Sequence, residues 1–222
     1  MKKATIKKRK VESSHHVPMT KKATLYRSPR GINRELKVMT FGSLGGYTSS
    51  TTAVQGAVSI PEGVSQGNRI GRKVEVYSIS VHATHTLALS AGLGTTADET
   101  RFSLILDRQP NKALPAVADF RTNTLPNAFP NPDNTKRFKV LVDQWTPLQL
   151  QLGGSGALGQ AAQYVTRTFY VKKKFNICWS NTSADYLGIT TNNIFIAYNS
   201  LQTYALSNCY LDITVQIKYY DD

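Results

Sequence analysis

The sequence predicts an all-β domain, a sandwich of about eight strands, that follows a basic N-terminal arm. Segments in which apolar and polar residues alternate recur along residues 38–222, as strands half-buried on a sheet require. Val, Thr, Ser, Asn and Gly are frequent, whereas long stretches rich in Ala, Leu, Glu and Lys are rare, which favours strands and turns over helices. Positive charge is concentrated before residue 38.

The length and composition suit one compact domain. The chain has 222 residues, of which 41% are hydrophobic, enough for a sizeable core. Neither membrane insertion nor secretion is expected, because there is no apolar run of about 18 residues and no apolar segment follows the basic N-terminus. Cys178 and Cys209 lie in apolar or aromatic stretches, which predicts buried thiols in a reducing compartment.

Period-two patterns place most of the strands. In residues 209–220, Leu211, Ile213, Val215 and Ile217 alternate with polar residues, which is the clearest strand pattern in the chain. In residues 72–89 the apolar phase slips between Val76 and Ile79, which predicts a β-bulge in a long strand. Other strands are expected at residues 101–107, 137–145, 164–177 and 193–200, and near 54–60.

The connections between these strands predict how they are arranged. Residues 109–136, 146–163 and 180–192 are long and uneven in length, and no convincing helix exceeds two turns. Such loops favour a Greek-key sandwich over an up-and-down barrel. We therefore expect a single eight-stranded jelly-roll sandwich over residues 38–222. The glycine-rich residues 40–71 are expected to form a transition from the arm to this body.

The arm, residues 1–37, carries twelve Lys or Arg against Glu12 and Glu35, a net charge of +10, while residues 38–222 carry fifteen against twelve acids, a net charge of +3. A segment of this kind is expected to be flexible and disordered. Its cations are expected to bind nucleic acid by neutralising phosphates, although a solubilising tail is the alternative. The twelve residues are Lys2, Lys3, Lys7, Lys8, Arg9, Lys10, Lys21, Lys22, Arg27, Arg30, Arg34 and Lys37.

Two further basic segments extend this interpretation. Lys7, Lys8, Arg9 and Lys10 resemble a nuclear import signal. Lys172, Lys173 and Lys174, which share a predicted strand with Arg167, are expected to add a contact from the body if they face the nucleic acid; a solvated strand end is the alternative.

The sequence offers little for catalysis. It contains no nucleophile elbow, zinc-protease motif or phosphate-binding loop. His82 and His85 are three residues apart on a strand and therefore point to opposite faces, so no metal site is expected there. Asp107 and Arg108 have no evident catalytic partner. Pro110 ends their strand, so this pair is expected to determine loop geometry or a subunit contact. No enzyme activity and no cofactor are expected.

Three segments of the sequence resemble a known family. Residues 104–120, LILDRQPNKALPAVADF, and residues 137–145, RFKVLVDQW, which end at Trp145, are similar to segments in the coat proteins of geminiviruses and other circular single-stranded DNA viruses. Residues 67–81, GNRIGRKVEVYSISV, resemble the opening of their first long strand. Recognisable motifs cover residues 67–145.

This resemblance implies a capsid protein with a single jelly roll, located in the virion and, during assembly, in the host nucleus. Its partners would be other copies of itself, single-stranded DNA and host nuclear import factors. The simplest closed icosahedral shell has sixty copies (T=1), and sixty arms of charge +10 would neutralise about 600 phosphates. Satellite viruses with RNA genomes have a similar jelly roll, so the sequence leaves DNA and RNA open. It also leaves open a cellular protein that binds single-stranded nucleic acid, and an enzyme.

Overall fold

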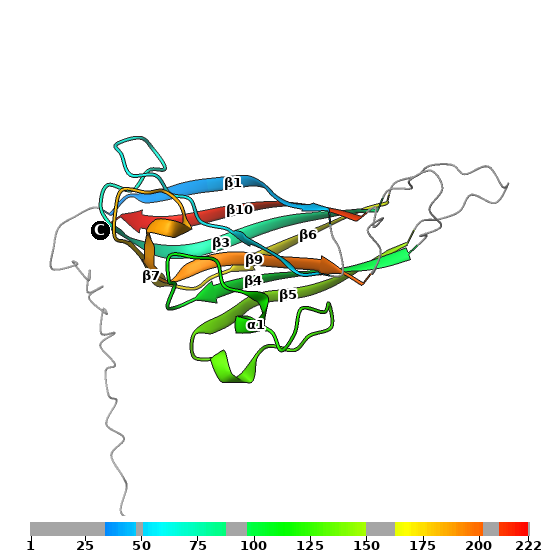
Figure 1. Ribbon diagram of the computed structural model, residues 1–222. Helices are drawn as coiled ribbons and strands as arrows, with labels where there is room; N and C mark the ends of the chain where they lie inside the picture. Colours follow the sequence, from blue (N-terminus) through cyan, green and yellow to red (C-terminus); the bar gives the residue numbers. More distant parts are fainter. Residues whose placement is uncertain (1–33, 48–50, 88–96, 150–162, 202–208, 222) are drawn as a thin grey trace, which may run out of the picture. The chain divides into compact units, whose positions relative to one another are not determined.

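The computed structural model describes residues 34–47, 51–87, 97–149, 163–201 and 209–221. These residues form two antiparallel sheets. One sheet contains β1 (Leu36–Tyr47), β10 (Cys209–Asp221), β3 (Lys73–Leu87), β6 (Gln163–Val171), β7 (Phe175–Trp179) and β8 (Ile189–Thr191). The other contains β2 (Ala53–Gly56), β9 (Asn193–Ser200), β4 (Ala97–Asp107) and β5 (Phe138–Gln149). The two sheets lie one above the other in Figure 1.

The strand order is that of a jelly roll. β6 and β7 pair with successive parts of the same strand, β3, and so act as two halves of one interrupted strand. If they are counted as one and the three-residue β8 is set aside, the first sheet joins the first, last, third and sixth strands. The second sheet joins the second, seventh, fourth and fifth. This alternation of strands between two sheets confirms the predicted eight-stranded jelly-roll sandwich.

The core lies between the sheets and follows the predicted alternation. Leu211, Ile213, Val215 and Ile217 of β10 are all buried in the main hydrophobic cluster. The predicted bulge in β3 is also confirmed, because the register with β10 shifts between the pairs Lys218–Ser78 and Tyr219–Val76. Tyr77 is the extra residue, and the inward-facing positions change phase there.

The two central strands of the second sheet, β4 and β9, are buried on both faces. Every residue of β9 is buried, because the connection between β4 and β5, residues 108–137, folds over the outer face of this sheet. It contributes α1 (Val117–Phe120) and the 3₁₀ helix η1 (Pro132–Asn134). Phe120 packs edge-on against Phe138 and Phe195 at centroid distances of 6.1 and 5.2 Å. In Figure 1, α1 lies on the side of β4 and β5 away from the first sheet.

The structure corrects several predicted boundaries. β1 begins at Leu36, so Leu36 and Lys37 belong to the sheet and not to the arm. The segment expected to be a transition, residues 40–71, contains the larger part of β1 and all of β2. The strand expected at 164–177 is interrupted at Lys172–Lys174. Thr146 to Gln149, expected to lie in a loop, continue β5. Cys209 is buried as predicted, whereas Cys178 on β7 is only half-buried.

The predicted positions of the two histidines of β3 are confirmed. His82 is exposed on the outer face of its sheet, and His85 is buried on the inner face. The Nδ1 atom of His85 lies 2.6 Å from Thr100 Oγ1, and its Nε2 atom lies 3.4 Å from Thr146 Oγ1. Burial, and to a lesser extent the positive charge of Arg167, lowers the pKa of His85 to about 4. His85 is therefore neutral in the folded protein at neutral pH.

This neutral, buried histidine predicts acid sensitivity. Between about pH 6.5 and pH 4 the unfolded chain binds a proton at residue 85 that the folded chain does not, so the free energy of unfolding falls as the pH is lowered. Below pH 4 the total loss of unfolding free energy from this residue reaches about 3 kcal/mol, which is the free energy that corresponds to the pKa shift. Urea unfolding of the wild type and of His85→Gln at several pH values measures it. The Gln variant should lose less stability than the wild type over this range, and His82→Gln should behave like the wild type. Equal acid losses in all three proteins would contradict the assignment.

Candidate nucleic-acid interface

The described domain begins at one end of the first sheet with two residues that were predicted to belong to the arm. Arg34 donates a hydrogen bond of 2.5 Å to Glu75 Oε2. Lys37 is only 7% exposed and donates to Asp221 Oδ2 at 2.9 Å and to the Asn68 carbonyl at 2.7 Å. Both cations already have partners in the fold. Ten predicted arm contacts lie outside the described residues: Lys2, Lys3, Lys7, Lys8, Arg9, Lys10, Lys21, Lys22, Arg27 and Arg30.

Lys172, Lys173 and Lys174 form the short irregular segment between β6 and β7. They were predicted to lie on one continuous strand with Arg167, and the interruption corrects that prediction. The β3 register pairs Ile79 with Val171 and Val76 with Phe175. The three lysines therefore lie beside the bulge at Tyr77. The ammonium groups of Lys172 and Lys174 are 5.8 and 5.9 Å from the centroid of the Tyr77 ring, and both side chains are exposed.

A second tyrosine completes this group. Tyr220 on β10 contacts Tyr77 edge-on, with ring centroids 6.0 Å apart and an interplanar angle of 79°. Tyr220 is also the register partner of Leu36, the first residue of β1. We refer to Tyr77, Lys172, Lys174 and Tyr220 as the Tyr–Lys cluster. It lies at the end of the sheet where the described domain begins.

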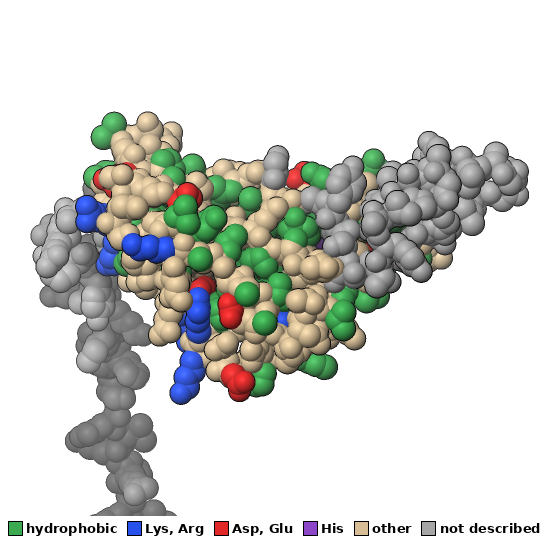
Figure 2. Space-filling view, viewed as in Figure 1, with side chains coloured by type: hydrophobic (Ala, Val, Ile, Leu, Met, Phe, Trp, Pro, Cys, Tyr) green, Lys and Arg blue, Asp and Glu red, His purple; other side chains and the backbone are tan. Residues whose placement is uncertain are grey.

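Lys173 belongs to a separate group of cations with Lys139 on β5 and Arg108 at the end of β4. Partial burial, a contact with the Lys139 ammonium group and the charge of Arg108 together lower the pKa of Lys173 to about 8. An anion bound here would offset the repulsion that lowers the pKa of Lys173, and a phosphate is an anion that Lys and Arg bind well. Figure 2 shows Lys and Arg side chains gathered at one end of the described domain.

Asp107 is a structural residue. Its buried carboxylate accepts two hydrogen bonds of 2.9 Å from Arg137, on Oδ1 and Oδ2, and a third from the Gln109 amide. The contact with Asp107 raises the pKa of Arg137. Asp107 thus joins the first residues of the 108–137 connection to its last residue, and Pro110 is buried within this connection.

Trp145 lies on β5, and the Arg101 guanidinium is 5.1 Å from the centroid of its ring. Arg101 is buried and donates to both carboxylate oxygens of Asp143 and to the Pro126 and Ala128 carbonyls. Beside it, burial and the charge of Arg101 lower the pKa of Arg121 to about 10. Burial raises the pKa of Asp143, but hydrogen bonds from Arg101 and Ser103 outweigh this effect and lower the pKa. These buried arginines anchor the 108–137 connection and are inaccessible to nucleic acid.

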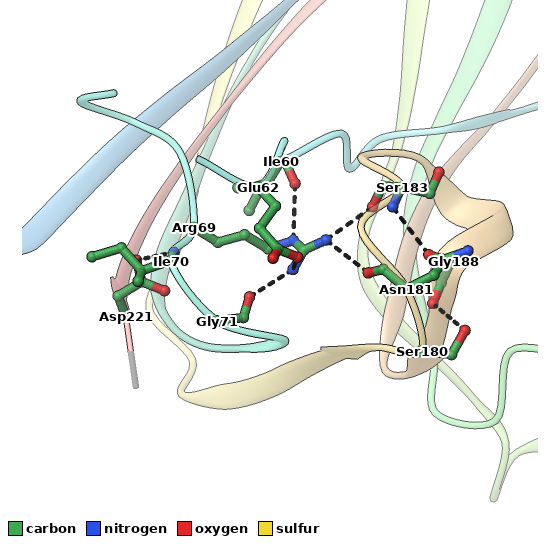
Figure 3. A network of polar contacts seen from close by, with 10 residues as sticks. All are labelled: Ile60, Glu62, Arg69, Ile70, Gly71, Ser180, Asn181, Ser183, Gly188 and Asp221. Carbon is green, nitrogen blue, oxygen red and sulfur yellow. Dashed lines mark hydrogen bonds and ion pairs between the residues drawn. The ribbon is translucent and has the colours of Figure 1, made fainter. Parts of the chain in front are cut away.

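Arg69 is a second buried arginine with a structural role. Its side chain is 0% exposed. It donates to the carbonyl oxygens of Ile60, Gly71, Asn181 and Ser183 and to Glu62 Oε2, at 2.6 to 3.2 Å. Its guanidinium lies 4.6 Å from the Trp179 ring centroid. Figure 3 shows that these acceptors come from two loops, the β2–β3 loop and the loop after β7.

Sequence reasoning did not predict the contacts of this candidate site between residues that are far apart in the sequence. Tyr77 and Tyr220 were not expected to meet, and neither were Arg108, Lys139 and Lys173. The lysine run itself was visible in the sequence, and the slip in apolar phase pointed to Tyr77. Among the described residues there is no group of three or more His, Cys, Asp or Glu that could hold a metal ion. No helix in the described ranges is long and apolar enough to cross a membrane.

The chain matches no protein-family model and no curated protein sequence. Among solved structures it is similar to one of Desmodium yellow mottle tymovirus, with 12% identity, a TM-score of 0.32, and coverage of 100% of this chain and 96% of that one. A structure of Cocksfoot mottle virus gives 13% identity and a TM-score of 0.32, covering 86% and 95%. The decameric capsid protein of BFDV gives 11% identity and a TM-score of 0.15, covering 84% and 100%. With TM-scores below 0.5, these likenesses carry no argument about function.

Proposed function

We propose that the chain is a viral capsid subunit that assembles into a closed shell and packages a nucleic-acid genome. The observation that carries the proposal is the combination of a jelly-roll sandwich with a net charge of +10 in residues 1–37 and only +3 in the rest. Jelly rolls occur in viral capsids, lectins and cupins. Neither sugar binding nor cupin chemistry needs such an arm, whereas packaging requires many phosphates to be neutralised.

The proposed mechanism divides the work between the arm and the body. The arm residues neutralise phosphates without regard to sequence, so packaging depends strongly on salt. Lys172, Lys173 and Lys174 add contacts at the end of the domain where β1 begins. The segment that carries them lies beside Tyr77, which contacts Tyr220, the register partner of Leu36. No step of this mechanism uses a catalytic group, a cofactor or a metal ion.

The finer parts of the proposal are a T=1 shell of sixty copies, a genome of single-stranded DNA and assembly in the host nucleus. DNA is favoured over RNA because residues 104–120 and 137–145 resemble segments of the coat proteins of circular single-stranded DNA viruses. The nuclear location rests on Lys7, Lys8, Arg9 and Lys10, which would bind host import factors. An RNA genome of the satellite type is the alternative for the same fold.

Sedimentation of the recombinant full chain after nuclease treatment tests this function. We expect one fast boundary of uniform particles with a 260/280 nm absorbance ratio that indicates protected nucleic acid. Sensitivity of the extracted nucleic acid to DNase or RNase then distinguishes the two genomes. A slow boundary near the 24.5 kDa of the single chain, persisting at all salt and pH conditions, would contradict the capsid role. Binding of nucleic acid in that state would indicate a non-viral single-strand-binding protein.

A further inference from the structure

We propose that the Tyr–Lys cluster is a binding subsite for one unpaired nucleotide, whose base stacks on Tyr77, held edge-on by Tyr220, and whose phosphates contact Lys172 and Lys174. The inference rests on the proposed nucleic-acid binding and makes it more specific. The charge of the arm can bind the phosphates of duplex and single strands alike. This subsite, in contrast, requires a base that is free to stack.

The bulge in β3 presents Tyr77 to solvent. At positions 76 and 79 the side chains of β3 are buried in the core, and the extra residue between the register pairs places the Tyr77 ring on the outer face. Tyr220 stands on the next strand and meets the ring edge-on at 6.0 Å. Both tyrosines are half-buried, so their rings are held by neighbours and still reach solvent. Tyr220 thus supports the Tyr77 ring from its edge, and the Tyr77 ring offers an aromatic face to a base.

The charges at this end of the sheet favour an anion. The two nearby carboxylates already have cationic partners, since Glu75 is bound by Arg34 and Asp221 by Lys37. Within the described ranges, neither Lys172 nor Lys174 takes part in a salt bridge. Their ammonium groups lie over the Tyr77 ring at 5.8 and 5.9 Å. Because lysine stems are flexible, a base can replace the ammonium groups on the ring while these groups move to its flanking phosphates.

The group formed by Arg108, Lys139 and Lys173 provides an internal comparison. It has charge of the same sign on the same domain, but no aromatic contact joins it in the described structure. It is expected to attract phosphates of single and double strands equally. A preference for single strands can therefore be assigned to the tyrosines and not to positive charge in general.

The test uses the full chain, thymidine oligonucleotides about 20 residues long, and a duplex with the same number of phosphates, at about 0.5 M salt, where phosphate contacts are weakened. Tyr77→Leu keeps apolar bulk but removes the aromatic face. It should lower affinity for the single strand about 5- to 100-fold and leave duplex affinity unchanged, and Tyr77→Trp should restore it. Lys139→Ala, the matched control, should affect both nucleic acids equally. Equal losses for both in Tyr77→Leu, or no loss, would overturn the subsite.

A second measurement needs no variant. Ultraviolet cross-linking of the wild-type protein to an oligonucleotide containing 5-bromodeoxyuridine, followed by peptide mapping, should yield adducts at Tyr77 or Tyr220. Adducts found only in residues 1–33 would overturn the subsite while leaving the proposed function intact. Absence of any binding by the full chain would instead overturn the proposed function.

Discussion

Deletion of residues 1–33 is expected to abolish packaging and leave the folded domain intact. The deletion removes ten of the chain's Lys and Arg residues and one acid, Glu12, so the net charge falls by nine from +13 to +4. If each of the ten cations meets a phosphate, the slope of log affinity against log salt concentration falls in magnitude by about 7 for a single strand. The protected nucleic acid per particle and this slope are the quantities to measure.

A length-matched control separates charge from chain length. In this variant the ten Lys and Arg residues of 1–33 are replaced by Gln, and the arm keeps its length. It should package as little nucleic acid as the truncated protein, while the urea midpoints of both should match the wild type. Retention of wild-type amounts of nucleic acid by either variant would show that the arm does not hold the genome.

The deletion must stop at residue 33 because the next residues belong to the fold. Sequence reasoning could not separate Lys37 from the other arm lysines, since a Lys within a basic run is expected to be solvated. In the structure Lys37 is an inward-facing residue of β1 whose ammonium group reaches Asp221 and the Asn68 carbonyl. Removing residues 1–37 would confuse loss of nucleic-acid binding with loss of the first strand.

The elements that were predicted correctly are those whose apolar residues follow a clear pattern in the sequence. β10 has one face in the core and alternates without interruption, and the bulge of β3 could be located because both apolar phases are clear. β4 was predicted from the alternation of Phe102, Leu104 and Leu106, although in the structure both of its faces are buried. β1 was missed because Gly42, Gly45 and the buried Lys37 obscure its alternation. The interruption between β6 and β7 was missed because local pattern alone does not reveal that two strand segments pair with one neighbour.

The candidate site was less predictable than the fold, because its residues come from different strands. Which of them lie side by side depends on the register in which those strands pair. Tyr77 and Tyr220 are brought together by the shift in pairing between β3 and β10. The same applies to the ion pair between the buried Arg101 and Asp143. Asp143 faces Ser103 across β5 and β4, and nothing in the local sequence of either strand indicates that Arg101 will bind that carboxylate.

Arg69→Met is expected to lower the free energy of unfolding by about 3–5 kcal/mol, as does removal of one partner from a buried, hydrogen-bonded charge. Met has a similar length, so little volume is lost, but four carbonyl oxygens and Glu62 lose their donor. Arg69→Lys should recover only part of the loss, because a single ammonium group cannot reproduce the planar fork of a guanidinium group. Urea unfolding measures both effects.

The matched control is Arg34→Met, at a surface arginine whose side chain is 42% exposed and pairs with Glu75. Exposed ion pairs contribute little, so this variant should lose less than about 1 kcal/mol. Limited proteolysis should show new cleavage in residues 61–72 and 180–188 of Arg69→Met only, because these are the two loops that the guanidinium joins. If Arg69→Met and Arg34→Met had the same urea midpoint, the two loops would be held by their backbone hydrogen bonds, such as Ile60 to Ala184 and Trp179 to Arg72. Arg69 would then be dispensable to the fold.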